Sequence, residues 1–348
     1  MFKSKSILFL ALTIILIMGV FSFGYAADEG TILLGVGIRD LANPYHAALG
    51  EGGKLYAQSI GQEKNLVILA CEGSSEKQLN DIKALIARAK GEVVFLIDPN
   101  EGQDALAIAI ECEKNKVYFV TQWNKPADVK VSDYKYWVTH IGIDSVTTGY
   151  ETAKTLFNAI GGKGKVFAVQ GMLGNNAAIG RWEGFQKALK EYPGIELVGW
   201  EVADWEKAKS FNATANALIA NPDLAAVWCA NDSMAMGSLE ALRAKGLAGK
   251  VPVAGADAIP EMLEAIKNGE AVATASTDPL WQAGEGLAIA LAAKMGKIDV
   301  AALPENKRDW EAPSVQINSE NIDWFMENYI TAHPVYDYDN YWEKWTAK

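Results

Sequence analysis

The strongest constraint on the fold is a repeated alternation of short apolar segments with amphipathic helical segments along residues 31–254. Continuous runs of Val, Ile, Leu and Phe predict strands that are buried on both faces. Such strands, when separated by helices, form parallel sheets covered by helices on both sides. The first series has strands at Ile32–Ile38, Leu66–Ala70, Val93–Ile97 and Val117–Thr121, and helices at Ala47–Ile60, Glu76–Ala89 and Asp104–Lys114.

A polar and aromatic stretch, residues 124–137, interrupts this rhythm, and the alternation restarts after Thr139–Ile143. The second series has strands at Val166–Val169, Ile195–Glu201, Ala225–Cys229 and Val251–Ala254, and helices at Val146–Ile160, Asn176–Glu191, Glu206–Ala220 and Ser233–Lys245. Two series indicate two lobes, so we predict an α/β fold with two doubly wound parallel-sheet lobes.

The chain is expected to cross between the lobes three times, near Ile143-Asp144, Thr277-Asp278 and Glu311–Ser314, which gives a three-strand hinge. The predicted N-terminal lobe is therefore 31–143 plus 278–312. The C-terminal lobe is 144–277 plus 313–348 and includes a tail rich in aromatic residues.

Residues 1–26 have the features of a cleavable secretory signal peptide. Lys3 and Lys5 precede the apolar run Ile7–Phe23, which is short beside the roughly 20 apolar residues of a membrane span, and Gly24-Tyr25-Ala26 resembles a cleavage site. The segment holds no cysteine for lipidation. We expect a periplasmic protein that is exported, soluble and not lipid-anchored.

The composition argues against several classes of function. The chain has 32 Lys and Arg against 43 Asp and Glu, a formal net charge of −11, which disfavours nucleic acid as a partner. The three cysteines, Cys71, Cys112 and Cys229, are predicted to be buried free thiols rather than to include a Cys71–Cys112 disulfide. The three histidines lack metal-ligand spacing, so no metal and no cofactor are expected.

Candidate binding residues follow the predicted strands directly. The carboxyl ends of parallel strands meet at one edge of a sheet, where ligands bind in open α/β folds. The residues at these positions are Arg39, Asn43–His46, Cys71-Glu72, Asp98, Gln122-Trp123, Gly171–Asn176, Ala203–Trp205, Asn231-Asp232 and Asp257.

Five of these regions resemble the type I periplasmic sugar-binding proteins, which include ribose-binding protein and share their fold with LacI-type repressor cores. The matching segments, in register over about 31–318, are Asn43-Pro44-Tyr45, Phe95–Pro99, Gln170-Gly171 with Arg181–Phe185, Ala230–Asp232 with Met234–Gly237, and Val253–Asp257. The resemblance implies a monomeric binding protein with this two-lobe fold. Such a protein closes its hinge around a small neutral sugar or sugar alcohol and delivers it to the permease subunits of an ABC importer.

The resemblance also implies roles for individual side chains. Asn43 and Asn231 correspond to paired amides that donate to and accept from hydroxyls, and Arg181 and Asp257 correspond to a guanidinium and an acceptor carboxylate. Tyr45 and Trp205 correspond to aromatic walls that pack on the apolar faces of a sugar. As alternatives, Asn43 is only a turn residue before Pro44, and Asn231 is only a helix cap.

Several departures from the ribose-binding pattern bear on the ligand. Gln122-Trp123 replaces an Asp-Arg pair, Ala256 an aromatic residue, Thr277 a glutamine, and Arg39 a small hydroxyl residue. These changes disfavour ribose and favour a polyol. Arg39 and Arg181 balance Asp98 and Asp257, which favours a neutral ligand. The predicted ligand contacts are Arg39, Asn43, Tyr45, His46, Asp98, Gln122, Trp123, Arg181, Trp205, Asn231, Asp257 and Thr277.

Two other classes of function are disfavoured and one stays open. Gly35-Val36-Gly37 lacks the third glycine of a dinucleotide turn, and no nucleophile motif occurs, so an enzyme is not expected. A repressor needs a helix-turn-helix where this chain has an export signal. A sensor that presents its ligand to a membrane chemoreceptor or kinase is the alternative that the sequence leaves open.

Overall fold

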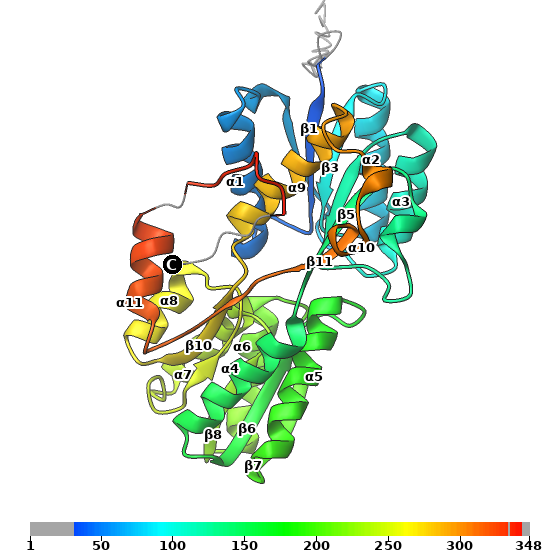
Figure 1. The fold of residues 1–348 in the computed structure, drawn as a ribbon. Helices are drawn as coiled ribbons and strands as arrows, with labels where there is room; N and C mark the ends of the chain where they lie inside the picture. Colours follow the sequence, from blue (N-terminus) through cyan, green and yellow to red (C-terminus); the bar gives the residue numbers. More distant parts are fainter. Residues whose placement is uncertain (1–30, 333–334, 343–348) are drawn as a thin grey trace, which may run out of the picture.

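The computed structural model describes residues 31–332 and 335–342, so the predicted signal peptide at 1–26 lies outside the described residues. The described chain forms two α/β lobes, one above the other in Figure 1, each built on a six-stranded sheet with helices packed against it. This confirms the predicted fold class. The two carboxyl-terminal edges face each other across the junction between the lobes.

The first lobe has its strands in the order β11-β5-β4-β3-β1-β2, all paired in parallel. The strands are β1 (Leu33–Ile38), β2 (Leu66–Ala70), β3 (Val93–Ile97), β4 (Phe119–Gln122), β5 (Trp137–Ile143) and β11 (Asp309–Ala312). The helices are α1 (Pro44–Ser59), α2 (Ser75–Arg88), α3 (Asp104–Asn115), α9 (Pro279–Lys294) and the short α10 (Glu305–Arg308). Strands β1 and β3 are buried along their whole length, as their continuous apolar sequences predict.

The second lobe has the order β12-β10-β9-β8-β6-β7, parallel except that β12 runs antiparallel to β10. Its strands are β6 (Lys163–Gln170), β7 (Gly194–Val202), β8 (Leu224–Cys229), β9 (Val253–Ala254), β10 (Ala271–Ser276) and β12 (Val315–Asn318). Its helices are α4 (Ser145–Ala159), α5 (Asn176–Glu191), α6 (Lys207–Ala220), α7 (Asp232–Ala244), α8 (Pro260–Lys267) and α11 (Ile322–Phe325).

Three connections join the sheets. The chain passes from β5 to α4 at Asp144, from β10 to α9 at Thr277-Asp278, and from β11 to β12 at residues 313–314. These are the crossings that the sequence predicts, and they lie together at the junction of the two lobes (Figure 1).

The helices that point at the junction begin at side-chain caps. Asn43 Oδ1 accepts from the backbone N–H of Tyr45 at 2.9 Å, and Pro44 occupies the first turn of α1. Asn231 Oδ1 accepts from the N–H of Met234 at 3.0 Å and begins α7. Both asparagines are therefore caps, and their remaining amide nitrogen atoms are available for other contacts.

The aromatic tail divides between the lobes. Ile322, Phe325 and Tyr329 join the core of the second lobe, and the chain continues from α11 as a π-helical segment, Met326–Thr331. Tyr336 and Tyr338 instead pack on the core of the first lobe, where the red segment reaches α1 and α9 in Figure 1. The sequence placed all of 313–348 with the second lobe, and the docking of residues 335–342 differs from that expectation.

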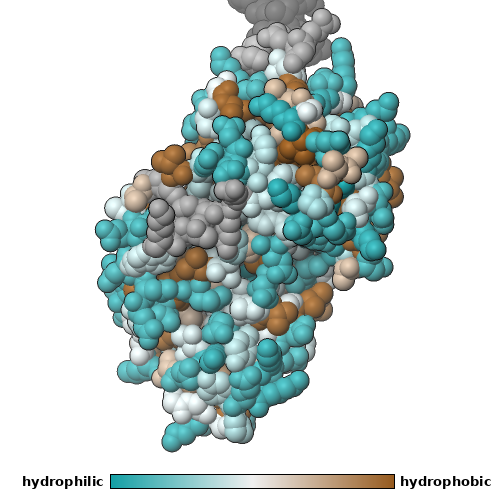
Figure 2. Space-filling view, in the orientation of Figure 1, coloured by the Kyte–Doolittle hydropathy of each residue, from teal (hydrophilic) through white to brown (hydrophobic). Residues whose placement is uncertain are grey.

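Within 31–332 and 335–342, no helix is long and apolar enough to cross a membrane. In Figure 2, the visible face is mostly hydrophilic, with hydrophobic residues in small separate groups. The three cysteines are buried free thiols, as predicted.

Candidate functional site

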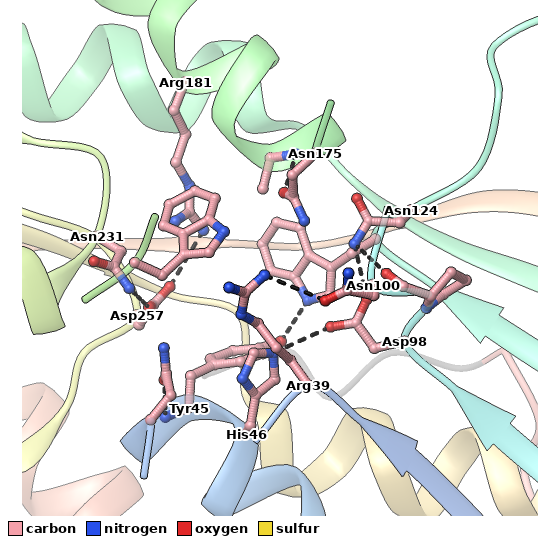
Figure 3. Close-up of a pocket in the computed structure, with 15 residues that line it drawn as sticks. Arg39, Tyr45, His46, Asp98, Asn100, Asn124, Asn175, Arg181, Asn231 and Asp257 are labelled. Carbon is pink, nitrogen blue, oxygen red and sulfur yellow. Dashed lines mark hydrogen bonds and ion pairs between the residues drawn. The ribbon is translucent and has the colours of Figure 1, made fainter. Parts of the chain in front are cut away.

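A pocket lies between the lobes, where the carboxyl ends of the two sheets face each other (Figure 3). Its empty volume, which includes space open to solvent, is about 450 Å³. Its lining residues come from both lobes and are Arg39, Asn43, Tyr45, His46, Asp98, Pro99, Asn100, Trp123, Asn124, Asn175, Ala177, Arg181, Trp205, Asn231 and Asp257.

Gln122 and Thr277 are the predicted contacts that do not line the pocket; the other predicted contacts do. Gln122 ends β4 and is fully buried, and its side-chain amide has no hydrogen-bond partner in the described part of the chain. The Thr277 hydroxyl donates to the Tyr45 hydroxyl at 3.4 Å, so Thr277 touches a lining residue from behind.

The predicted contacts omit three lining asparagines, Asn100, Asn124 and Asn175, together with Pro99 and Ala177, although Asn175 lies within the candidate segment Gly171–Asn176. Asn100 and Asn124 lie one to three residues beyond the positions that we selected after β3 and β4. Asn175 caps α5, accepting from the N–H of Ala177 at 3.1 Å. A search extended by three residues past each strand end would have found Asn100 and Asn124, whereas Asn175 lies five residues past the end of β6.

An ion pair from the second lobe occupies one side of the pocket. Arg181 Nη2 lies 3.2 Å from Asp257 Oδ1, and Arg181 Nη1 donates to the Ala230 carbonyl at 2.8 Å. Asn231 Nδ2 donates to the other Asp257 oxygen at 3.3 Å. Burial raises the pKa of Asp257, and the Arg181 guanidinium opposes that rise. Figure 3 shows Arg181 descending from the second lobe towards Asp257 and Asn231.

A second polar group comes from the first lobe. His46 Nε2 lies 3.3 Å from Asp98 Oδ2, and Asn124 Nδ2 donates to Asp98 Oδ1 at 3.0 Å. Arg39 Nη1 donates to Asn100 Oδ1 at 3.2 Å, and its Nε lies 3.8 Å from Asp40. Both carboxylate oxygens of Asp98 therefore have a polar partner, and the Arg39 guanidinium contacts both Asn100 and Asp40.

Aromatic rings form the walls of the pocket. The indole N–H of Trp123 donates to the Tyr45 hydroxyl at 2.7 Å, and the two rings meet edge to face. The Arg181 guanidinium carbon lies 5.1 Å from the Trp123 ring centroid and 5.9 Å from that of Trp205. Cation–π attraction thus links a wall from each lobe through one arginine.

Three lining residues have left-handed backbone conformations although none is glycine. The φ angles are 58° at Trp123, 68° at Trp205 and 126° at Asp257. Non-glycine residues in such conformations cost about 1–3 kcal/mol each and concentrate at functional sites. The backbone is therefore shaped at the pocket to aim these side chains inward.

Direct bonds join the lobes beside the pocket. The Asn176 N–H donates to Asn124 Oδ1 at 3.0 Å, and Asn176 Nδ2 donates to the Lys125 carbonyl at 2.7 Å. Gly102 and Gly174 also share a backbone bond of 3.3 Å. These contacts show that the structure represents the closed arrangement of the two lobes.

Amides, paired charges and aromatic walls in an interlobe pocket define a binding protein that encloses a small molecule. In 31–332 and 335–342, no cluster of His, Cys, Asp and Glu is arranged to hold a metal ion.

The chain belongs to the periplasmic binding protein family, since the model of the periplasmic binding protein domain matches residues 34–298. Sequence relatives include the ribose import binding protein RbsB of Salmonella typhimurium, 32% identical over 254 residues, 73% of this chain and 81% of the relative. The xylitol-binding protein of Mycolicibacterium smegmatis is 27% identical over 307 residues, 88% of this chain and 82% of that protein. The family consists of transport binding proteins, which confirms the prediction that the chain is not an enzyme.

Among solved structures, the twin-arginine translocation pathway signal protein from Burkholderia phytofirmans has a TM-score of 0.86 and 41% identity to this chain. The match covers 89% of this chain and 96% of that structure. The similarity therefore extends over both lobes.

Proposed function

We propose that this protein binds one small neutral sugar or sugar alcohol between its lobes and delivers it to an ABC importer. It acts in the periplasm as an exported monomer, and the closed form is the one that the permease subunits recognise. The observation that carries the proposal is the interlobe pocket, whose amides, charges and aromatic rings come from both lobes. The names of the relatives that bind ribose and xylitol support this class of ligand.

The arrangement of charges supports a neutral ligand. Arg181 is paired with Asp257 and Arg39 with Asp40, while Asp98 is within hydrogen-bond distance of His46 and accepts from Asn124. A charged ligand would have to separate one of these pairs or be buried beside a group already neutralised, and burying an unpaired charge is strongly unfavourable. Hydroxyls need no such rearrangement, because the side-chain nitrogens of Asn43 and Asn175, whose oxygens cap α1 and α5, can donate hydrogen bonds to them.

Within neutral ligands, the pocket favours a linear polyol over ribose. The position of a family arginine is taken by Trp123, whose ring lies beside the Arg181 guanidinium instead of presenting a charge. An aromatic wall packs against the C–H groups of a ligand. It therefore fixes the orientation of fewer ligand hydroxyls than a charged arginine would. The likeness to a xylitol-binding protein, over 88% of this chain and 82% of that protein, agrees with this preference.

Isothermal titration calorimetry with D-ribose, D-allose, xylitol, erythritol and D-glucuronate tests the proposal. We expect at least one neutral compound to bind with one site per chain and D-glucuronate to show no measurable heat of binding. Among the neutral compounds, a polyol should bind more tightly than ribose. Preferential binding of glucuronate, or no binding of neutral sugars and polyols as a class, would contradict the proposal.

The importer role is favoured over the sensor alternative, because the ribose relative is named for import. Reconstitution of the native permease in vesicles, with and without this protein, separates the two roles. Uptake that is independent of the protein would support the sensor alternative.

A further inference from the structure

A buried pair of side chains lies directly behind the pocket residue Asp257. Asp232, the first residue of α7, is fully buried, and Thr274 in the middle of β10 is equally inaccessible. The Thr274 hydroxyl donates to the Asp232 carboxylate, with distances of 2.9 and 2.8 Å to its two oxygens. Neither residue lines the pocket.

This pair holds two backbone amides of the loop that carries Asp257. The N–H of Ala258 donates to Thr274 Oγ1 at 3.1 Å, and the N–H of Ile259 donates to Asp232 Oδ2 at 3.1 Å. On the other side of the loop, the N–H of Asp257 donates to the Ala275 carbonyl at 2.8 Å. Three consecutive amides are thus fixed by α7 and β10.

The loop needs such support because its backbone is strained. Asp257 has φ 126° and Ala258 has φ 54°, both in conformations that residues with a Cβ seldom adopt. Such conformations persist only where the surrounding structure over-determines them. The approach is also close, because a Cβ at Gly255 would lie 2.3 Å from Asp232 Oδ1, so only glycine fits there.

Asp232 occupies this place despite an unfavourable environment for its charge. Burial and the neighbouring Asp257 carboxylate raise the pKa of Asp232. The carboxyl accepts from the loop amide of Ile259 and from the hydroxyl that in turn fixes Ala258. Its hydrogen bonds therefore all serve the conformation of the loop.

We infer that Asp232 and Thr274 are positioning residues for ligand recognition, which hold Asp257 in its strained conformation and so aim its carboxylate into the pocket. Without the hydroxyl, the Ala258 amide loses its acceptor and the loop can relax to an ordinary backbone conformation. Asp257 then leaves the 3.2 Å contact with Arg181 and the 3.3 Å contact with Asn231. This inference rests on the proposed function, in which Asp257 accepts from a ligand hydroxyl.

The main test replaces Thr274 without changing any charge. Thr274→Val keeps the shape and removes the hydroxyl, whereas Thr274→Ser keeps the hydroxyl. Xylitol and D-ribose serve as probes in calorimetry, and we expect Thr274→Val to weaken the tighter-binding probe about tenfold, the effect of losing one hydrogen bond to a buried group. Thr274→Ser should restore most of the affinity.

The matched control is Thr214→Val, which removes another fully buried hydroxyl of the same lobe, one that bonds to Ser238 at 2.8 Å. It should lower thermal stability without changing affinity. Asp232→Asn, which keeps one acceptor oxygen, is the second variant if Thr274→Val does not fold. We expect it to weaken binding in the same direction by a smaller factor.

A double-variant cycle separates positioning from general damage. If Thr274 acts through Asp257, adding Thr274→Val to Asp257→Ala should cause no further loss of affinity. Additive losses, or full affinity in the folded Thr274→Val protein, would overturn the inference.

Hydrogen exchange of the ligand-free protein tests the loop without relying on the proposed function. Thr274→Val should speed exchange of the Asp257, Ala258 and Ile259 amides about tenfold or more relative to Thr214→Val. Unchanged protection of all three amides refutes the positioning role whatever the protein binds. Faster exchange, with no binding of either probe by the native protein, leaves the positioning of the loop standing and counts against the proposed function.

Discussion

Arg181 makes several kinds of contact within the pocket. It is buried, pairs with Asp257, donates to the Ala230 carbonyl, and lies over the rings of both Trp123 and Trp205. Because Trp123 belongs to the first lobe and Asp257 to the second, this one side chain couples the two halves of the pocket. Its helix position in α5 was predicted from the sequence, whereas its stacking between two indoles depends on the meeting of the lobes.

Replacing Arg181 should therefore affect stability as well as binding. Arg181→Ala leaves the buried Asp257 carboxylate without its cation, so we expect the free energy of unfolding to fall by roughly 3 kcal/mol. The double variant Arg181→Ala/Asp257→Ala should regain part of that loss, because it no longer buries an uncompensated charge. Urea denaturation measures both variants. A double variant that is less stable than Arg181→Ala would contradict the assignment of this pair.

At the scale of elements, the sequence predicts most helices and strands closely, and the differences have local causes. The predicted helix Asn176–Glu191 has the observed bounds of α5. Helix α1 begins at Pro44, three residues before its predicted start, because the Asn43 cap and the proline form its first turn. Strand β9 begins at Val253 instead of Val251, since Pro252 has no amide hydrogen for the ladder.

The pocket was predictable to the extent that it follows strand ends. Asp98, Asn231 and Asp257 each lie within three residues of the end of a strand, and the structure brings them to one pocket. The role of Thr274 was not predictable, because it lies within a strand and acts through tertiary contacts to a loop. The docking of residues 335–342 on the first lobe also depends on tertiary packing, which no periodic pattern records.

The docked tail meets α9 at a buried carboxyl group. Glu285 accepts from the Trp342 N–H at 2.7 Å through Oε1, while Oε2 has no hydrogen-bond partner within the described residues. Burial raises the pKa of Glu285 to about 8. The hydrogen bond from the backbone N–H of Trp342 opposes this rise, and the negative charge of Asp337 adds to it. A Cβ at neighbouring Gly284 would lie 2.3 Å from the Tyr338 ring, so the tail packs closely against the helix.

This geometry predicts a pH-dependent stability. The pKa of Glu285 is raised in the folded state, so the folded protein holds this proton more tightly than the unfolded chain. The resulting contribution to folding stability is fully present below about pH 4.5 and is lost as the pH rises towards 8. Glu285→Gln keeps an acceptor and cannot ionise, so its melting temperature relative to the native protein should increase between pH 5 and pH 9. A raised carboxyl pKa corresponds to about 1.4 kcal/mol per unit, so the difference amounts to a few kcal/mol at most.

Glu264→Gln, at an exposed position of α8, controls for the loss of one negative charge. Thermal melts of the three proteins at pH 5, 7 and 9 provide the comparison. If Glu285→Gln and Glu264→Gln respond alike across this range, the buried carboxyl does not determine the pH dependence.

At the scale of the whole molecule, three adjacent crossings allow the lobes to bend about their junction while limiting other motions. The bonds of Asn176 to Asn124 and Lys125 form only when the lobes meet. Ligand contacts from both lobes would add to these bonds and shift the population towards the closed form. Under the proposed function, this change of shape would let a permease distinguish loaded from unloaded protein.

Small-angle X-ray scattering on the purified protein tests this account most directly. Profiles are recorded without ligand and with a saturating concentration of the neutral sugar or polyol that calorimetry shows to bind most tightly. We predict a smaller radius of gyration with ligand and a bound profile that matches the closed structure, with a weaker change in Arg181→Ala. Superimposable profiles at a saturation verified by calorimetry would contradict the claim that the two lobes close around the ligand.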